Sequence, residues 1–252
     1  MKTFAFFNMK GGVGKTTAAV NLAYLAAQEG YRTLLWDLDA QGAATFHFPV
    51  TPTVQLKAKN FHKEKERLDR LIKTTDYTNL DLIPSNFKIR HLDVALGNLK
   101  KGTKLLSQFI KKLVPRYDYA FFDCPASLSL LAQSVFRASD ILIIPMIPTI
   151  LSVQTYEQMQ RYLARHYQQK PQLIGFFSMV DQRKTLHREI IAQQQAKEQV
   201  FCQATIPNRS EIEKMGQHRA PLPAFNPNSQ ATKEFRMLWT EIKRRSDDLT
   251  LT

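Results

Sequence analysis

The stretch Lys10-Gly11-Gly12-Val13-Gly14-Lys15-Thr16-Thr17 separates a short apolar run, Thr3–Asn8, from an Ala- and Leu-rich run, Thr16–Gln28. The first run predicts a buried strand, and the second predicts a helix that ends near Gly30, a typical C-cap residue. Glycines at this junction let the backbone turn and approach an anion without a Cβ clash. The order strand, glycine loop, helix therefore predicts a phosphate-binding loop.

Each position of this loop has an expected role. Successive backbone N–H groups and the helix N-terminus are expected to point at a phosphate, while Lys15 reaches the β- and γ-phosphates and the Thr16 hydroxyl binds Mg²⁺. A glycine turn with a chance lysine is the simpler alternative, and the G-x-G-K-T-T core disfavours it. The predicted nucleotide-binding residues of the loop are Lys10, Gly11, Gly12, Val13, Gly14, Lys15, Thr16 and Thr17.

Lys10 departs from the general pattern G-x-x-x-x-G-K-[ST], whose first glycine would fall at Met9. A cation at this position cannot easily fold back onto the phosphates of its own loop. It can instead reach a phosphate held by a second subunit. A solvated lysine with no role is the alternative interpretation.

Apolar runs alternate with helical patterns along the rest of the chain. The helical patterns include Leu151–Tyr167 and Lys184–Lys197. This alternation predicts an α/β fold with a mostly parallel, twisted sheet and helices on both faces, and residues 1–252 are predicted to be one domain. The further predicted strands are Thr33–Trp36, Leu80–Ile83, Tyr119–Phe122, Ile141–Ile144 (stopped by Pro145), Leu173–Met179 and Val200–Ile206.

Three carboxylates follow predicted strands directly. Asp37 and Asp39 come after the second strand, and Asp123 comes after the Tyr119–Phe122 strand. Ligands of open α/β sheets bind at the carboxyl ends of the strands, so these side chains are expected near the phosphate loop. Candidate Mg²⁺ ligands are Thr16, Asp37 and Asp123, and one carboxylate of the Asp37/Asp39 pair is expected to orient a water. Turn or N-cap roles are the alternative for each Asp.

The charge is strongly positive, with 35 Lys and Arg against 22 Asp and Glu, a net of +13. Residues 57–116 hold 15 Lys and Arg against 6 acids, and residues 151–252 hold 15 against 10, whereas the motif-bearing segments are nearly balanced. A basic surface apart from the phosphate loop favours a polyanion partner such as nucleic acid. The mixed-sign run Lys57–Lys73 is interpreted as a solvated helix.

The two cysteines, Cys124 and Cys202, form no C-x-x-C pair, which suits a reducing cytosol. The N-terminal apolar run is too short for a signal peptide, and no run approaches the ~18 residues of a membrane helix. We therefore expect a cytoplasmic protein without a membrane partner.

At these residues the sequence resembles the deviant Walker A ATPases, and within them the ParA/Soj partition ATPases. The resemblance implies catalytic roles for Lys10 (contacting ATP across a sandwich dimer), Lys15, and Asp39 (positioning the hydrolytic water). It also implies that Asp123 is the Walker B acid and that a side chain at Gly12 blocks dimerisation. The matching motifs are Lys10–Thr17, Asp37–Thr45, Asn79–Ser85, Asp123–Ser127 and Ile206–Arg209, of which Pro207 and Asn208 match a segment near the adenine.

The resemblance further implies ATP and Mg²⁺ as cofactors, an ATP-dependent homodimer, non-specific DNA as partner, a ParB-like adaptor that stimulates hydrolysis, and association with the nucleoid. The sequence departs from the family at Ala40 and Ala126, where the family usually has Pro, and in the apolar run Pro145–Ile150. The candidate DNA-binding residues are Arg183, Lys184, Arg188, Arg209 and Arg219.

Three alternatives stay open at this point. A MinD-like membrane-associated ATPase would use the apolar stripe of Phe235, Leu238, Trp239 and Ile242, although core packing explains this stripe better. An iron–sulfur carrier would need bridging cysteines, for which only Cys124 is near the loop. A nucleotide-gated DNA-binding scaffold that hydrolyses negligibly alone is the third.

Overall fold

The computed structural model describes residues 1–50, 71–85, 96–97, 105–168 and 171–247. Within these residues one sheet of seven strands has the order β3-β4-β2-β5-β1-β6-β7, and every pair is parallel except β3 with β4. The predicted α/β fold is confirmed. The strands are β1 (Lys2–Phe6), β2 (Thr33–Asp37), β3 (Lys73–Thr74), β4 (Leu80–Ile83), β5 (Tyr119–Asp123), β6 (Ile141–Met146) and β7 (Gln172–Phe177).

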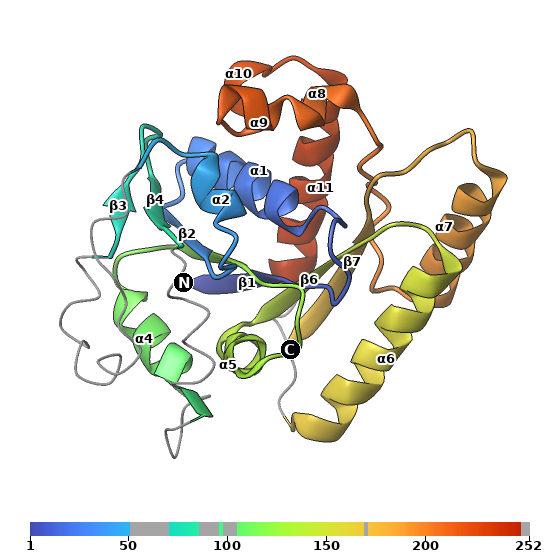
Figure 1. Ribbon diagram of the computed structural model, residues 1–252, viewed down its shortest axis with the longest axis horizontal. Coiled ribbons are helices and arrows are strands. Elements are labelled where there is room, and N and C mark those ends of the chain that lie inside the picture. Colours follow the sequence, from blue (N-terminus) through green and yellow to red (C-terminus); the bar gives the residue numbers. More distant parts are fainter. Residues whose placement is uncertain (51–70, 86–95, 98–104, 169–170, 248–252) are drawn as a thin grey trace.

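Helices cover both faces of the sheet (Figure 1). One apolar core lies between the sheet and α1, α2, α10 and α11, and a second lies between the sheet and α4, α5, α6 and α7. Burial on both sides explains why β2, β5 and β6 are entirely buried and lack an alternating pattern. The helices are α1 (Lys15–Gln28), α2 (Ala43–Phe46), α4 (Leu105–Leu113), α5 (Leu130–Ala138), α6 (Ile150–His166), α7 (Thr185–Lys197), α8 (Ser210–Glu213), α9 (Met215–His218), α10 (Leu222–Phe225) and α11 (Gln230–Asp247).

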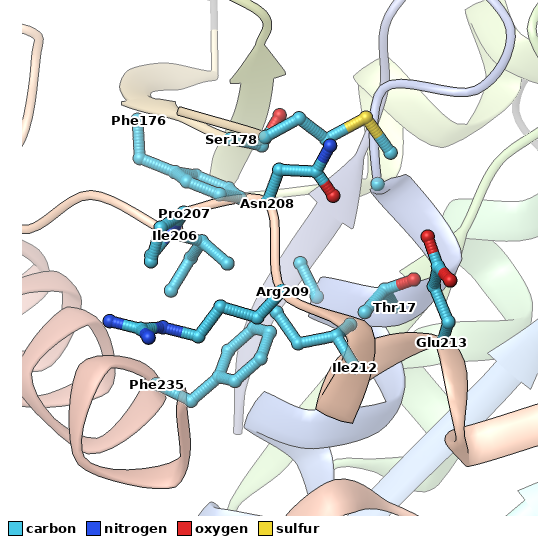
Figure 2. A pocket seen from close by; sticks show the side chains of 13 residues that line it. Thr17, Phe176, Ser178, Ile206, Pro207, Asn208, Arg209, Ile212, Glu213 and Phe235 are labelled. Atoms are coloured by element: carbon cyan, nitrogen blue, oxygen red, sulfur yellow. The ribbon is translucent and has the colours of Figure 1, made fainter. Parts of the chain in front are cut away.

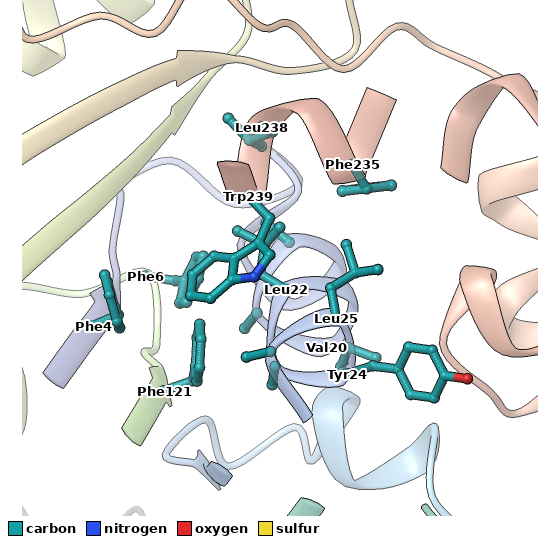
Figure 3. Close-up of a cluster of buried hydrophobic side chains, with 14 of the residues drawn as sticks. Phe4, Phe6, Val20, Leu22, Tyr24, Leu25, Phe121, Phe235, Leu238 and Trp239 are labelled. Carbon is teal, nitrogen blue, oxygen red and sulfur yellow. The ribbon is translucent and has the colours of Figure 1, made fainter. Parts of the chain in front are cut away.

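The apolar stripe of the C-terminal helix packs on the core. Trp239 is 1% exposed and lies over the aromatic rings of Phe4 and Phe121 at centroid distances of 5.9 and 5.7 Å (Figure 3). Phe235, Leu238 and Ile242 are buried in the same cluster. The predicted core packing is confirmed, so this stripe does not present an apolar face to lipid.

The prediction of a strand at Val200–Ile206 is wrong. The segment lies beside β7 but makes only one isolated parallel bridge, Phe201 with Gly175, and a second, Pro207 with Val180, follows directly after it. Some backbone groups of this segment bind side chains and not a neighbouring strand. The carboxylate of Glu241 accepts hydrogen bonds from the N–H groups of Gln203 and Ala204 at 3.0 and 2.9 Å. On the same segment Arg245 donates to the Phe201 carbonyl at 2.8 Å.

Two further details differ from expectation. β3 was not predicted, since two residues carry no detectable pattern. Pro145 does not stop β6, which continues to Met146. The pairing of β6 with β1 has already ended at Ile143, so no hydrogen bond between these two strands is lost because Pro145 lacks an N–H.

The run Lys57–Lys73 lies outside the described residues except at its end. In the part of the chain that the structure covers, no helix is both long enough and apolar enough to cross a membrane.

Candidate active site

The phosphate loop connects β1 to α1 through two glycines with left-handed backbone angles, Gly12 (φ 71°) and Gly14 (φ 86°). Gly14 is the N-cap of α1, and no side chain caps the helix. The first N–H groups of α1 are therefore left for an anion, which a helix N-terminus attracts through its dipole. A side chain at Gly12 or Gly14 would strain this backbone.

Two residues that sequence reasoning missed hold the loop in place. Asn8 is buried; its amide donates to the Pro145 carbonyl at 2.8 Å, and its Oδ1 accepts the N–H of Lys10 at 2.9 Å. Ser178, just after β7, donates from Oγ to the Val13 carbonyl at 2.7 Å. A polar residue at the end of an apolar strand was the only signal available for either.

Lys15 extends along the inside of the loop. Its side chain is buried, and Nζ lies 3.4 Å from the Lys10 carbonyl oxygen. Burial lowers the pKa of Lys15, and the negative charges of Asp123 and Asp39 partly oppose this shift. An ammonium group that is desolvated and faces carboxylates is poised to exchange these contacts for a phosphate.

Thr16 and Asp123 lie together at the mouth of the phosphate loop, where a metal ion would be held. The Thr16 hydroxyl donates to Asp123 Oδ2 at 2.7 Å, and the second oxygen, Oδ1, is buried without a hydrogen-bond partner. Burial, followed by the charge of Asp37, raises the pKa of Asp123 well above its ordinary value. An orphaned buried carboxylate oxygen beside a threonine hydroxyl fits Mg²⁺, whose shell of waters and phosphates needs one or two protein oxygens.

No group of three or more His, Cys, Asp or Glu in the described residues is arranged to hold a metal by itself. Mg²⁺ in nucleotide sites is completed by phosphates and waters, so it does not require such a group. Cys124 is buried, with its Sγ 3.7 Å from the Phe122 carbonyl oxygen, as expected for a small core residue.

Asp37 pairs in register with Asp123 across β2 and β5, which brings the two carboxylates together. Both oxygens of Asp37 already accept hydrogen bonds: Oδ1 from the Asp39 N–H at 3.1 Å, and Oδ2 from the N–H and hydroxyl of Thr45, each at 2.7 Å. Burial raises the pKa of Asp37 to about 6 despite these bonds. Asp37, one of the three candidate Mg²⁺ ligands, therefore uses both carboxylate oxygens to hold the loop that contains Asp39 and Thr45.

Asp39 lies in that loop and is half-buried. Its Oδ1 accepts the Gln41 N–H at 3.0 Å, and its backbone carbonyl accepts the Ser85 hydroxyl at 2.6 Å and the Gly42 N–H at 2.9 Å. The loop is therefore held by its backbone although Ala40 replaces the family's proline. Lys10, Lys15, Asp39 and Asp123 all lie at one edge of the sheet, as the sequence predicted.

A pocket beside the start of α1 contains the other predicted nucleotide contacts (Figure 2). Pro207 and Asn208 line it, together with Gly14, Thr17 and Phe176. The Asn208 N–H donates to the Val180 carbonyl at 3.0 Å, which fixes this segment against the end of β7. The pocket joins an apolar wall to the phosphate loop, the arrangement that a flat base attached to a phosphate chain requires.

The five candidate DNA-binding residues do not form one cluster. Arg183, Lys184 and Arg188 are exposed together at the start of α7, although Arg183 pairs with Asp181 at 3.0 Å. Arg209 forms a two-bond pair with Glu234 at 2.9 and 3.2 Å. Arg219 donates to the Phe46 carbonyl at 3.1 Å and lies 4.9 Å from the Phe46 ring centroid, so it holds the end of α2.

A parallel sheet with a glycine loop between a central strand and a helix, and carboxylates at the mouth of that loop, defines a P-loop nucleotide-binding protein. A family model described as an AAA domain matches residues 1–174. The chain belongs to this family, and its motifs identify it as a ParA/Soj-type P-loop ATPase.

One relative in sequence agrees with this assignment, and two solved structures share the fold. The sporulation initiation inhibitor protein Soj of Bacillus subtilis is 28% identical over 248 residues, spanning 96% of this chain and 98% of Soj. The fold also matches a plasmid partition protein from Borrelia burgdorferi (TM-score 0.76, 21% identity, 97% of this chain and 98% of the other). The fold of cobyrinic acid a,c-diamide synthase from Mycobacterium smegmatis, solved with an ATP analogue and magnesium, also matches (TM-score 0.82, 22% identity, 97% of this chain and 94% of the other).

Proposed function

We propose that this protein is a ParA-like positioning ATPase that binds Mg-ATP, forms a sandwich dimer, binds DNA non-specifically and releases it on hydrolysis. The observation that carries the proposal is the Thr16–Asp123 pair at 2.7 Å, with an unpartnered buried Asp123 oxygen, beside an uncapped helix N-terminus. Mg²⁺ held at this pair would neutralise charge on the phosphates.

Lys15 and the loop N–H groups bind the phosphates in this proposal. Asp39 orients the attacking water from the loop that Asp37 and Thr45 organise. Lys10 acts on the ATP of the partner subunit, in a role similar to that of an arginine finger, which can contribute roughly 10³–10⁵ in rate.

Exposed small and apolar residues support a dimer at the same edge. Gly11 and Gly12 are exposed, and a Cβ built on either meets no atom within 4 Å. Ile150 and Leu151, the first two residues of α6, are 71% and 60% exposed at the carboxyl end of β6. Apolar side chains exposed beside a phosphate loop favour burial against a second copy of the chain.

The positive charge and the partition relatives support the DNA-binding and adaptor parts of this proposal, and we expect the protein at the nucleoid. The MinD-like membrane alternative loses its main support, because its apolar stripe is buried on the core. The cargo is left open between a plasmid, a chromosome and a protein assembly.

The test compares wild type with Lys10→Ala in ATP turnover and in size-exclusion chromatography with ATP and Mg²⁺. We expect ATP binding to persist in Lys10→Ala, while DNA- and adaptor-stimulated turnover falls by roughly 10²-fold or more. Mixing it with Lys15→Ala, which supplies an intact Lys10, should restore part of the turnover. Unchanged turnover in Lys10→Ala would contradict the role in trans.

A further inference from the structure

A second concave surface lies on the molecule, far from the phosphate loop. Its lining residues come from α4, from the last turn of α5 and from the end of α6. Figure 1 shows where these three helices lie. Because α4, α5 and α6 end just before β5, β6 and β7 begin, this cleft lies at the amino ends of the strands. The phosphate loop lies at the opposite, carboxyl edge.

The cleft is lined by cations and amides. Its polar lining residues include Gln108, Lys111, Arg137, Arg165, His166 and Gln168, and none of the described residues that line it is acidic. Lys111, Arg137 and Arg165 are exposed. In the part of the chain that is described, none of these three forms an ion pair, and Arg137 lies 4.9 Å from the Tyr167 ring centroid.

Basic residues at the C-terminal ends of helices can also be explained without a ligand, because they neutralise the negative end of the helix dipole. Comparing the two charges tests whether this explanation is sufficient. Each helix C-terminus carries about −0.5 charge, so three converging ends contribute roughly −1.5. Lys111, Arg137 and Arg165 contribute three full positive charges. The helix ends therefore offset only about half of this charge, and the cleft keeps a positive potential.

Two of the candidate DNA-binding arginines, which lie nearer the carboxyl ends of the strands, differ in this respect. Arg183 and Arg209 are paired with Asp181 and Glu234, so a phosphate would have to displace a carboxylate there. In the cleft a phosphate would displace only counterions, whose release favours binding of the nucleic-acid backbone.

We propose that this cleft is a second DNA-binding surface that contacts the phosphate backbone of duplex DNA and acts without nucleotide. This inference goes beyond the proposed function, because the site is present in each subunit without ATP-dependent dimerisation. It rests on the proposed function for the choice of DNA as the partner. Each subunit contains a whole cleft on the side away from the edge that faces the partner subunit. The cleft therefore supplies a basal affinity, and ATP-driven pairing adds to it through avidity.

The test measures fluorescence anisotropy of a labelled duplex of arbitrary sequence over a series of salt concentrations, without nucleotide and with Mg²⁺ and a non-hydrolysable ATP analogue. The cleft variant is Lys111→Gln/Arg165→Gln. The control, Lys233→Gln/Arg236→Gln, removes the same charge from exposed positions of α11, on the other face of the sheet. ATP binding and thermal midpoints check that both variants are folded.

We expect the cleft variant to lose roughly tenfold or more in nucleotide-free DNA affinity near 0.1 M salt, with a log–log salt slope shallower by about 2. The control should keep the affinity of wild type within about twofold, because its cations do not line the cleft. A cleft variant that matches wild type in affinity and slope overturns this inference and leaves the proposed function standing. If wild type binds no DNA in either nucleotide state, the DNA-binding part of the proposed function is wrong as well.

Discussion

Asp123 has no exposed surface and lies beside Asp37, so two carboxylates share one buried edge of the sheet. Burial and the charge of Asp37 raise the pKa of Asp123. A carboxyl group with a raised folded-state pKa contributes most to stability below its unfolded pKa, 3.8 here, and that contribution is lost as the pH rises. At neutral pH the buried carboxyl of Asp123 therefore lowers the free energy of unfolding, and a bound cation would reduce this loss.

The Asp123→Asn variant tests this cost, because it removes the charge and keeps an acceptor for the Thr16 hydroxyl. Without nucleotide or Mg²⁺, we expect the variant to be more stable than wild type at pH 8 by roughly 1–3 kcal/mol. The difference should shrink as the pH falls from the raised folded-state pKa of Asp123 toward the unfolded value of 3.8. Urea unfolding at a series of pH values measures it, and a difference independent of pH would contradict the argument.

Asp39 can be tested separately, since its loop is held mainly by its backbone carbonyl and not by its side chain. We expect Asp39→Ala to retain Mg-ATP and DNA binding while turnover falls by about 10²-fold or more, because the water loses its orienting group. Its release from DNA after ATP chase, followed by anisotropy, should be correspondingly slow. Release as fast as that of wild type would show that Asp39 does not position the water.

At the scale of elements, β7 and the segment that follows α7 depend on one glycine. A Cβ built on Gly175 would lie 2.6 Å from Phe201 Cε1, and that ring is held by Phe177 and Tyr156 at centroid distances of 5.0 and 5.1 Å. Because Gly175 has no side chain, the Phe201 ring can pack directly against β7, although the segment around Phe201 does not pair with β7 as a strand.

We therefore expect Gly175→Ala to destabilise the protein by roughly 1–3 kcal/mol through overpacking. The matched variant Phe201→Leu removes the edge of the ring that meets the Cβ. In the double variant the cost of Gly175→Ala should be much smaller, giving a measurable coupling energy in denaturant unfolding. Strictly additive costs would mean that the contact with Phe201 is not the cause.

Local pattern predicted the described strands except β3, and the helices α1, α6 and α7, to within about two residues. It also predicted that Thr16, Asp37, Asp39 and Asp123 converge. It failed where distant side chains decide the outcome. Ser178 holds Val13 across 165 residues, and Glu241 takes the N–H groups of Gln203 and Ala204. Neither contact leaves a trace in the sequence around the residue that it positions, which is why the strand at Val200–Ile206 was predicted and the role of Ser178 was not.

At the scale of the whole molecule, the C-terminal helix connects the ends of the chain. Trp239 contacts the rings of Phe4, Tyr119 and Phe121, and its indole N–H donates to Glu29 at 3.2 Å. Lys2 at the start of β1 pairs with Asp247 at 2.7 Å. These contacts support the prediction that residues 1–252 fold as one domain.

If so, Trp239→Ala should cost roughly 3–5 kcal/mol and lower the stability of the whole protein. Circular dichroism and ATP-protected proteolysis should then report the same shifted transition. A variant in which α11 unfolds while the rest retains the stability of wild type would contradict the single domain.

In the proposed function, Gly11 to Thr17 and Asp123 together hold the phosphates and the magnesium ion of one nucleotide. Isothermal titration calorimetry of ATP into wild type, with Mg²⁺ and with chelator, tests it most directly, with Lys15→Ala as the matched variant. We expect saturable binding near one ATP per chain that depends on Mg²⁺ and is lost in Lys15→Ala. Folded wild-type protein that shows no magnesium-dependent heat of ATP binding would contradict it.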